Sequence, residues 1–325
     1  MSVQPATARA GANIALVKYW GKRDARLNLP AAGSISVTLA GLETRTTVSP
    51  LPELDADELM LDGQPASAER IVPVLDRYRM LSGQDQHCRV ESTNSFPTGA
   101  GLASSASGFA ALVVAADAAF GTRLDAARLS EQARLGSGSA ARSIFGGFVE
   151  MAAGHGDDGR DAVAHPLLDA ADWPLEVVVA ITEIGPKSVS STDGMNRTMK
   201  TSPYYPAWVD SVPEDLERAR RAIDATDFEA LAEVSESSAL KMHASALAAQ
   251  PGLLYWNPAT VACLHEVRAL RAAGTGVFFT VDAGPQVKAI CLPGQGARVA
   301  GRLAGVDGVE RVIETTLGPG AGVLT

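Results

Sequence analysis

Strand-like and helix-like segments follow one another along this chain without a regular alternation, and that order limits the folds open to it. Residues 34–48 alternate apolar with polar or β-branched side chains, which predicts a strand, a turn and a second strand. Residues 175–182, LEVVVAIT, form one apolar run of strand length, which indicates a strand covered on both faces. Because no βα unit repeats, we expect an α+β protein of two sub-domains rather than a doubly wound sheet.

The other patterns are those of helices and strands of ordinary length. Helices are expected at 69–82, 106–120, 125–135, 213–225, 227–247, 259–273 and 294–304, and strands at 88–93, 147–151, 277–281, 287–292 and 309–316. Residues 183–212 contain or adjoin four prolines and are expected to be a loop-rich junction. We therefore expect two domains, residues 1–185 and residues 186–325.

Charge and cysteine content exclude several classes of protein. The net charge of −9 and the pI near 5.1 argue against a surface built for nucleic acid or for an anionic membrane. The three cysteines are far apart and form no C-x-x-C pair, so neither a disulfide framework nor a structural zinc site is expected to organise the fold. The N-terminus has no apolar stretch of signal-peptide length, and the longest apolar run, 109–116, is about half of a membrane span. We expect a cytoplasmic protein.

Two loops rich in glycine and serine are candidates for binding anions. Residues 97–106, PTGAGLASSA, follow an expected strand and open an expected helix, and residues 136–143 read GSGSAARS. Small residues let the backbone approach a phosphate closely, and a helix N-terminus offers free N–H groups. Ser104 and Ser105 can cap the helix or bind phosphate or magnesium, and Arg142 can grip a carboxylate or phosphate. Taken singly, each loop is equally compatible with an ordinary turn and helix cap.

Three further segments carry charged or hydroxyl side chains. Lys18 and Lys22 are two of only six lysines in a chain with twenty-two arginines, which suggests a need for a compact point charge. Asp282 lies in VDAGPQ between two expected strands, where it also suits a turn. Residues 188–195, SVSSTDGM, are rich in hydroxyl groups at the expected junction. Surface lysines, a turn former and a polar loop are the structural alternatives.

Considered together, these segments resemble one family. PTGAGLASSA is similar to the phosphate loop of the GHMP kinases, a superfamily of small-molecule kinases. The series ANIALVKYWGKRD, SISVTL, NSFPTGAGLASSASGF, GSGSAARSIFGGF, SSTDGM and DAGP resembles the diphosphomevalonate decarboxylase family, in that family's order, from residue 12 to residue 286. The length of several of these motifs argues against a chance match.

This resemblance implies both a fold and a reaction. The fold would be that of the GHMP kinases: a ribosomal-S5-like N-terminal domain that binds ATP, a ferredoxin-like C-terminal domain, and a cleft between them. The reaction would be ATP- and Mg²⁺-dependent phosphorylation of the tertiary 3-hydroxyl of mevalonate 5-diphosphate, followed by loss of phosphate and CO2 to give isopentenyl diphosphate. Such an enzyme is a lyase of the mevalonate pathway in isoprenoid biosynthesis, and the family commonly forms homodimers.

The resemblance also implies roles for individual residues. Asp282 would orient or deprotonate the 3-hydroxyl, Arg142 would hold the C1 carboxylate, and Lys18 would neutralise charge on the transferred phosphoryl group. The other residues implied at the substrate are Tyr19, Trp20, Gly21, Lys22, Arg70, Ser137, Gly138, Ser139, Ala140, Ala141, Ser191 and Thr192. Those implied at ATP are Ser92, Asn94, Gly99, Ala100, Gly101, Leu102, Ala103, Ser104 and Ser105, with Ser105 also a magnesium ligand.

Two positions depart from the family pattern. Gln286 stands where the family usually has Asn, and Gly99 where it usually has Ala, and neither change removes a charge, so we expect tuning rather than loss of activity. The alternatives on the same scaffold are a phosphomevalonate decarboxylase and a mevalonate 3-kinase, and a further alternative is an inactive paralogue that only binds. The retained Lys18, Arg142 and Asp282 favour an active decarboxylase, while the number of substrate phosphates stays open. The missing G-x-S-x-G motif argues against a serine hydrolase.

Overall fold

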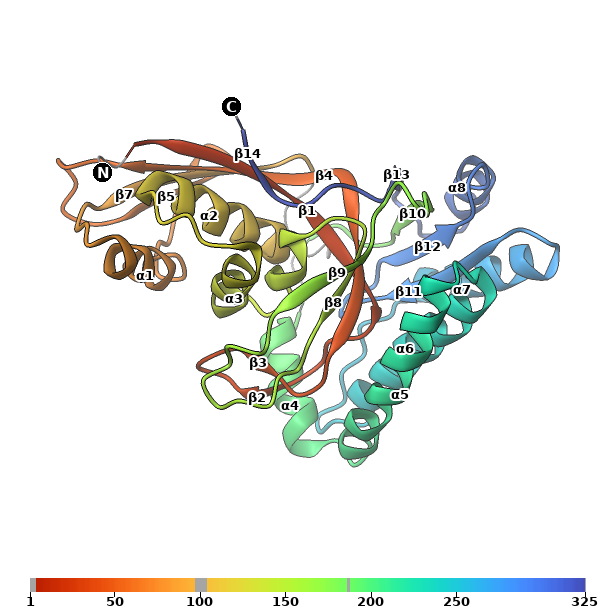
Figure 1. Ribbon diagram of the computed structural model, residues 1–325. Helices are drawn as coiled ribbons and strands as arrows, with labels where there is room; N and C mark the ends of the chain where they lie inside the picture. Colours follow the sequence, from red (N-terminus) through yellow and green to blue (C-terminus); the bar gives the residue numbers. More distant parts are fainter. Residues whose placement is uncertain (1–3, 97–103, 186–187, 325) are drawn as a thin grey trace.

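The computed structural model describes residues 4–96, 104–185 and 188–324, and over these ranges the chain forms one sheet of eight strands, one of four and a small hairpin (Figure 1). The first sheet has the order β14–β1–β4–β7–β5–β6, with β8 pairing β4 and β9 pairing β8. Its strands are β1 (Ala6–Val17), β4 (Ser34–Pro50), β5 (Glu58–Leu61), β6 (Gln64–Ala66), β7 (Cys88–Asn94), β8 (Phe148–Met151), β9 (Ala164–Leu168) and β14 (Gly322–Leu324). The second sheet contains β10 (Glu176–Ile181), β11 (Val277–Val281), β12 (Val287–Cys291) and β13 (Arg311–Thr316), and the hairpin pairs β2 (Lys22–Asp24) with β3 (Leu29–Pro30).

Six of the described helices begin where the sequence offers a cap or a proline. Asp125, Ser190, Asp227 and Asn257 each accept a backbone N–H at a helix start, which satisfies a donor that the helix itself leaves free. The helices are α1 (Val72–Ser82), α2 (Ser104–Phe120), α3 (Ala126–Gly136), α4 (Ser191–Thr201), α5 (Tyr205–Asp224), α6 (Phe228–Leu247), α7 (Pro258–Ala272) and α8 (Gly296–Ala304), with a 3₁₀ turn η1 (Ala140–Ile144).

Helices cover one face of the first sheet. Figure 1 shows α1, α2 and α3 on the same side of it, and α2 packs directly on β1 and β4. Ala110, Ala111 and Ala115 of α2 are fully buried in this core. Alanine combines a small side chain with the highest helix propensity, so the helix can lie close to the strands. This packing fixes the position of α2 and of its first residue, Ser104.

The second sheet is covered on both faces, as the apolar run at 175–182 predicted. Val177 and Val179 of β10 belong to a large core shared with β1, β4, α5 and α6. Val178 and Ala180, on the opposite face, pack with α7 and α8. The strand order β11–β12–β10–β13 is antiparallel throughout, with helices between β10 and β11 and between β12 and β13. This is the arrangement expected of a ferredoxin-like domain.

Two predictions about local structure were wrong. Residues 34–48 are not two strands joined by a turn, because β4 continues through Gly41, whose positive φ of 67° is absorbed by a register shift opposite Gly11 and Asn13 of β1. Residues 183–212 are not simply a loop, because they include α4 and the start of α5. Ser190 caps α4, and proline is tolerated at the start of α5 because the first-turn N–H groups have no partner inside the helix.

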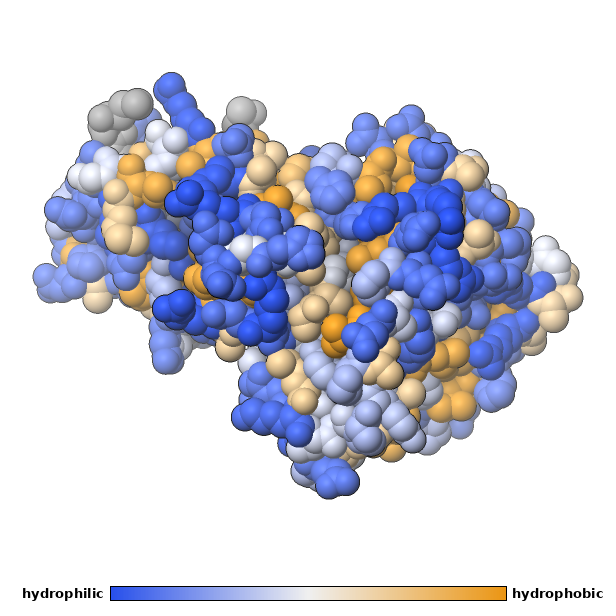
Figure 2. All heavy atoms as spheres, turned by 60° about the horizontal axis from the view of Figure 1, so that its bottom comes forward, coloured by the Kyte–Doolittle hydropathy of each residue, from blue (hydrophilic) through white to orange (hydrophobic). Residues whose placement is uncertain are grey.

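The expected division into two domains after residue 185 stays a prediction. Two strands pair with strands from the other side of that boundary. β10 precedes that position but pairs with β12 and β13, and β14 follows it but pairs with β1. Hydrophobic residues are interspersed with hydrophilic ones on the face shown in Figure 2. Within the described residues, no helix is long and apolar enough to cross a membrane.

Candidate active site

A cleft of about 670 Å³ lies where the end of β1, the start of α2, the start of α4 and the turn after β11 meet. Most of the residues singled out in the sequence line it, although they come from distant parts of the chain. The residues so placed are Lys18, Tyr19, Trp20, Lys22, Arg70, Ser104, Ser105, Ser137, Gly138, Ser139, Arg142, Ser191, Thr192 and Asp282.

Lys18 and Asp282 form an ion pair in this cleft. Lys18 follows the last residue of β1, and its Nζ donates to Asp282 Oδ1 and to the carbonyl oxygen of Ala15, each at 2.7 Å. The Lys18 side chain is 1% exposed, whereas that of Asp282 is 26% exposed and faces the cleft. Burial lowers the pKa of Lys18 to about 8, against the opposing charge of Asp282. The pair therefore presents a carboxylate to the cleft with a compact cation directly beside it.

A second lysine binds the other oxygen of the same carboxylate. Lys288 Nζ lies 3.2 Å from Asp282 Oδ2. Burial opposes ionisation of Asp282, but Lys18 and Lys288 together hold the pKa of its carboxyl well below its ordinary value. Lys288 was missed from the sequence, although it is another of the six lysines and follows the DAGP turn closely.

Arg142 is buried in η1 and has no carboxylate partner in the described part of the chain. Its Nη1 donates to Ser34 Oγ at 2.6 Å and its Nη2 to Asn13 Oδ1 at 3.1 Å, and its Nε has no hydrogen-bond partner among the described residues. Burial lowers the pKa of Arg142 to about 10, with Asp282 and Tyr19 acting in the opposite direction. A buried guanidinium without an acidic partner can be satisfied by an anion, and Arg142, unlike the equally buried Arg134, lines the cleft that a ligand enters. The cleft is therefore suited to a carboxylate or phosphate at Arg142.

Helix α6 supports both members of the Lys18–Asp282 pair from behind. Ser238 Oγ accepts the backbone N–H of Lys18 at 3.0 Å, and His243 Nε2 lies 3.3 Å from the carbonyl oxygen of Val281, which precedes Asp282. Burial lowers the pKa of His243 to about 3, so the ring is neutral and its Nε2–H donates to that oxygen. Neither residue was predicted, because a single serine or histidine within a helix forms no motif.

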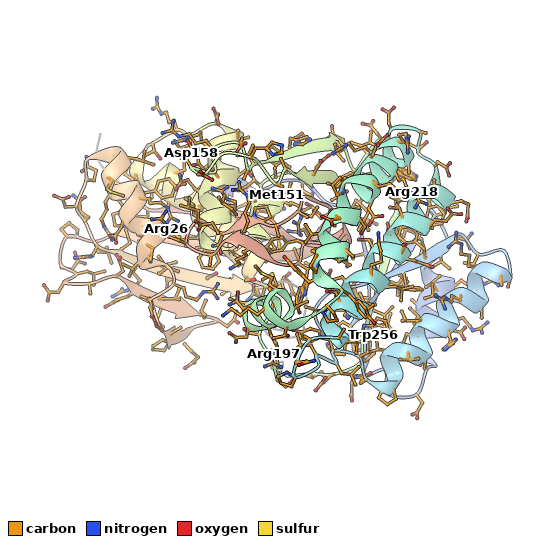
Figure 3. The ribbon with its side chains drawn as sticks, turned by 90° about the horizontal axis from the view of Figure 1, so that it is seen from below. Arg26, Met151, Asp158, Arg197, Arg218 and Trp256 are labelled. Atoms are coloured by element: carbon orange, nitrogen blue, oxygen red, sulfur yellow. The ribbon has the colours of Figure 1, made fainter. Side chains whose placement is uncertain are left out.

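An aromatic contact fixes the His243 ring. The centroid of the Trp256 ring lies 4.7 Å from that of His243. Figure 3 shows Trp256 and Arg197 of α4 on the same side of the molecule, and Arg197 Nη1 donates to the carbonyl oxygen of Pro251. The segment between α6 and α7 therefore contacts α4 and α6, both of which contribute residues to the lining of the cleft.

Two cations lie at another part of the cleft without an acidic partner. Neither Lys22 nor Arg70 makes an ion pair within the residues that the structure describes. Burial, and then the nearby charge of Arg70, lowers the pKa of Lys22. Tyr19 and Gly138 line the same cleft and pack together, and a Cβ at Gly138 would overlap the Tyr19 hydroxyl. This part of the cleft suits a multiply charged anion.

Helix starts supply hydroxyl groups to the same cleft. Ser190 caps α4 by accepting the Asp193 N–H at 3.1 Å, and Ser191 and Thr192 line the cleft at that helix start. Ser104 and Ser105 line the cleft at the start of α2. Both helices direct the positive ends of their dipoles toward the space that the cations surround.

Some predicted site residues do not line the cleft. Ala140 and Ala141 are fully buried in the cores, and Gly21, with a φ of 102°, packs against Tyr205. Ser92 and Asn94 lie on β7, where they hydrogen-bond to threonines of β4. The roles of these residues stay predictions, and Gly99, Ala100, Gly101, Leu102 and Ala103 lie outside the described residues.

Gln286, which departs from the family pattern, holds the Asp282 turn to β10. Its Oε1 accepts the Thr182 N–H at 2.6 Å, and its Nε2 donates to the carbonyl oxygen of Glu183 at 2.7 Å. Both bonds go to backbone groups just after β10, and the side chain is buried. The longer amide therefore satisfies buried backbone groups while keeping the turn in place.

The donor set fits a magnesium ion only if phosphate oxygens provide most of its ligands. Over the described ranges, no group of three or more His, Cys, Asp or Glu side chains is placed to hold a metal. Mg²⁺ is commonly held by one or two protein oxygens together with phosphates and water. The hydroxyls of Ser104 and Ser105 line the cleft and match that mode.

Comparisons with known proteins agree with this architecture. The profile of the diphosphomevalonate decarboxylase-like N-terminal domain matches residues 10–164, and that of the mevalonate 5-diphosphate decarboxylase C-terminal domain matches residues 177–320. The diphosphomevalonate decarboxylase of Saccharomyces cerevisiae is 38% identical over 306 residues, which cover 88% of this chain and 77% of the yeast protein.

Solved structures are similar over nearly the whole length. The mevalonate diphosphate decarboxylase of Staphylococcus aureus superposes with a TM-score of 0.93 at 37% identity, covering 99% of this chain and 98% of that one. A structure described as MDDEF in complex with MVAPP, AMPPCP and magnesium gives a TM-score of 0.92 at 38% identity, covering 99% of each chain. The expected GHMP kinase fold is thus confirmed, and this chain belongs to the diphosphomevalonate decarboxylase family.

Proposed function

We propose that this protein converts ATP and mevalonate 5-diphosphate to isopentenyl diphosphate, ADP, phosphate and CO2, with Mg²⁺. The observation that carries the proposal is one cleft that combines the Lys18–Asp282 pair with a buried Arg142 lacking an acidic partner. The Lys18–Asp282 pair is suited to orient a hydroxyl for phosphorylation. Arg142 is suited to align a carboxylate for loss of CO2. The similar structure with MVAPP, AMPPCP and magnesium supports ATP, Mg²⁺ and this substrate.

Phosphoryl transfer is the first step of the proposed reaction. The 3-hydroxyl oxygen bonds to the γ-phosphorus of ATP, the bond from that phosphorus to the bridging oxygen breaks, and ADP leaves. Asp282 accepts a hydrogen bond from the hydroxyl, aligns its oxygen, and receives its proton as the O–P bond forms. Because the transition state of phosphoryl transfer is loose, a carboxylate of low basicity suffices for this role. Lys18 stabilises negative charge on the transferring group.

Fragmentation is the second step. The C3–O bond breaks with its electron pair going to phosphate, the C1–C2 bonding pair forms the C2–C3 double bond, and CO2 leaves. Arg142 holds the C1 carboxylate so that the C1–C2 and C3–O bonds stay aligned. The Ser105 hydroxyl, together with phosphate oxygens, would hold Mg²⁺, which would neutralise charge on the ATP phosphates.

The substrate's terminal phosphates are assigned to Lys22, Arg70 and the serines of the loop before η1. These two cations have no ion-pair partner in the described part of the chain, and the serine hydroxyls of Ser137 and Ser139 line the same cleft, so the oxygens of two phosphates find donors there. ADP release should be measured with mevalonate, its 5-phosphate and its 5-diphosphate, together with product mass. We expect kcat/KM for the 5-diphosphate to exceed that for the 5-monophosphate by at least about a hundredfold, since two lost charge-assisted hydrogen bonds cost roughly 3 kcal/mol or more. Equal efficiency would favour a phosphomevalonate decarboxylase, and ADP release without CO2 a 3-kinase.

A cytoplasmic location and a homodimeric state are also proposed, on the family resemblance. Light scattering on the purified chain measures its mass in solution directly. A mass near the 33.7 kDa of one chain would contradict the homodimer.

A further inference from the structure

Lys288 occupies a position in the second sheet that an apolar residue would ordinarily fill. The register of the antiparallel pairs places it beside Thr280 of β11 and Val179 of β10. Because side chains alternate along a strand, it shares its face with Ile290, which belongs to the large core between the sheets. Its side chain is 2% exposed. A buried ammonium group is unfavourable unless it is paired, so this position calls for a partner of opposite charge.

That partner is the carboxylate at the centre of the cleft. Among the residues that the structure describes, Lys288 Nζ forms one ion pair, with Asp282 Oδ2 at 3.2 Å. Lys18, at the end of β1, binds Oδ1 of the same carboxylate. The two ammonium groups therefore come from different sheets and hold different oxygens. Rotation of the carboxylate about its Cβ–Cγ bond would break at least one of these contacts.

We propose that Lys288 is a positioning residue for phosphoryl transfer, which fixes the plane of the Asp282 carboxylate and keeps it ionised for the 3-hydroxyl. This inference rests on the proposed function. A carboxylate has about four lone-pair sites, so binding of both lysines leaves sites for a substrate hydroxyl. With Lys18 alone, Asp282 Oδ2 would be unrestrained. The carboxylate would then sample orientations in which its free lone pairs do not face the substrate hydroxyl.

Four titratable groups from different elements surround Asp282 and set the electrostatic potential at its carboxylate. Lys18 and Lys288 touch it, Arg142 lies close enough in η1 to interact with its charge, and His243 on α6 is neutral. Removing the cation at position 288 destabilises the ionised carboxylate, so the pKa of Asp282 should rise. Lys18 and Arg142 remain, so the rise is partial.

Kinetics of Lys288→Met and Lys288→Arg test this role. We expect Lys288→Met to lower kcat by at least about tenfold, the worth of one charge-assisted hydrogen bond, with KM for both substrates changed less than about threefold. Lys288→Arg keeps the charge and should restore a large part of kcat. Lys241→Met is the matched control, because it removes a lysine paired with Asp215 outside the cleft.

A carbon-13 NMR titration of aspartate-labelled protein tests the inference without relying on turnover. The Asp282 carboxyl signal is identified by its absence in Asp282→Asn, and its pKa should be higher in Lys288→Met than in the wild type. A wild-type protein that does not turn over mevalonate 5-diphosphate would contradict the proposed function but leave this titration informative. An unchanged pKa, an unchanged kcat, or failure of both Lys288 variants to fold would overturn the positioning role.

Discussion

Lys18 Nζ and Asp282 Oδ1 lie 2.7 Å apart although the two residues are 264 positions apart in the chain. Lys18 directly follows β1 of the first sheet, and Asp282 follows β11 of the second. Their contact therefore depends on the packing of the two sheets, which α6 reinforces by contacting both strands. Catalytic geometry and tertiary structure are established together in this chain.

Removing the charge of Asp282 should abolish turnover while leaving binding intact. General-base or orienting groups contribute about 10²–10⁴ to rate, so we expect Asp282→Asn to lower turnover by at least about a thousandfold. ATP and substrate affinity should change by less than about tenfold. Single-turnover assays should show ADP and CO2 release lost together, because decarboxylation requires the 3-phosphate.

The control for Asp282→Asn is Asp215→Asn. Asp215 is a buried carboxylate paired with Lys241 on neighbouring helices, away from the cleft. It should lower the melting temperature and leave turnover unchanged. Turnover of Asp282→Asn within tenfold of wild type, or CO2 release without ADP, would contradict the assigned role.

Replacing Arg142 with lysine should separate charge from geometry. The guanidinium can pair both oxygens of a carboxylate, whereas an ammonium group cannot. We expect Arg142→Lys to fold and to lose at least about a hundredfold in kcat, the worth of one or two charged hydrogen bonds. Arg134→Lys is the control, because Arg134 is equally buried but donates to backbone oxygens outside the cleft. Comparable turnover in both variants would show that Arg142 is only structural.

The pKa of Lys18 predicts a basic limb in the pH profile. Burial lowers that pKa to about 8, so the ammonium form that binds Asp282 and neutralises phosphoryl charge is present below this pH and is lost above it. Since kcat/KM reports the free enzyme, it should fall as pH rises through about 8. Initial rates between pH 6 and 10 at low substrate measure this, and Lys18→Arg should move the limb to higher pH. A profile that stays flat to pH 10 would contradict a role for the Lys18 charge.

The sequence predicted the fold and most of the cleft because motif residues lie at the ends of regular elements. Lys18, Asp282 and Arg142 were identified from local motifs, and all three line the cleft. Lys288 could not be found in that way, because its contact with Asp282 depends on the register of β11 and β12. His243 acts through a backbone oxygen of another element, which no local pattern encodes.

Local conformation was predicted less well where tertiary contacts decide it. Glycine is typical of turns, but at Gly41 the pairing with β1 keeps β4 continuous. The prolines of residues 183–212 indicated a loop, but proline is compatible with the first turn of a helix, where Pro206 lies in α5.

The last prediction concerns Gly138, whose missing side chain makes room for Tyr19. A Cβ at Gly138 would overlap the Tyr19 hydroxyl, and the Tyr19 ring, packed against the large core, has little freedom to move away. We expect Gly138→Ala to push this ring toward Lys22 and the anion-binding part of the cleft. KM for mevalonate 5-diphosphate should rise by at least about tenfold, the worth of one misplaced charge-assisted contact. Steady-state kinetics with each substrate varied in turn measure the effect.

The matched control for this variant is Gly301→Ala in α8, where a Cβ meets no neighbouring atom. Alanine is favoured over glycine inside a helix by about 1 kcal/mol, so that variant should melt slightly higher and keep its kinetics. KM for ATP should stay near wild type in both variants, because Tyr19 is assigned to the other substrate. A Gly138→Ala enzyme with wild-type KM for mevalonate 5-diphosphate would show that Tyr19 can yield without disturbing the cleft, and a rise in KM for ATP alone would place the nucleotide, not the diphosphate, beside Tyr19.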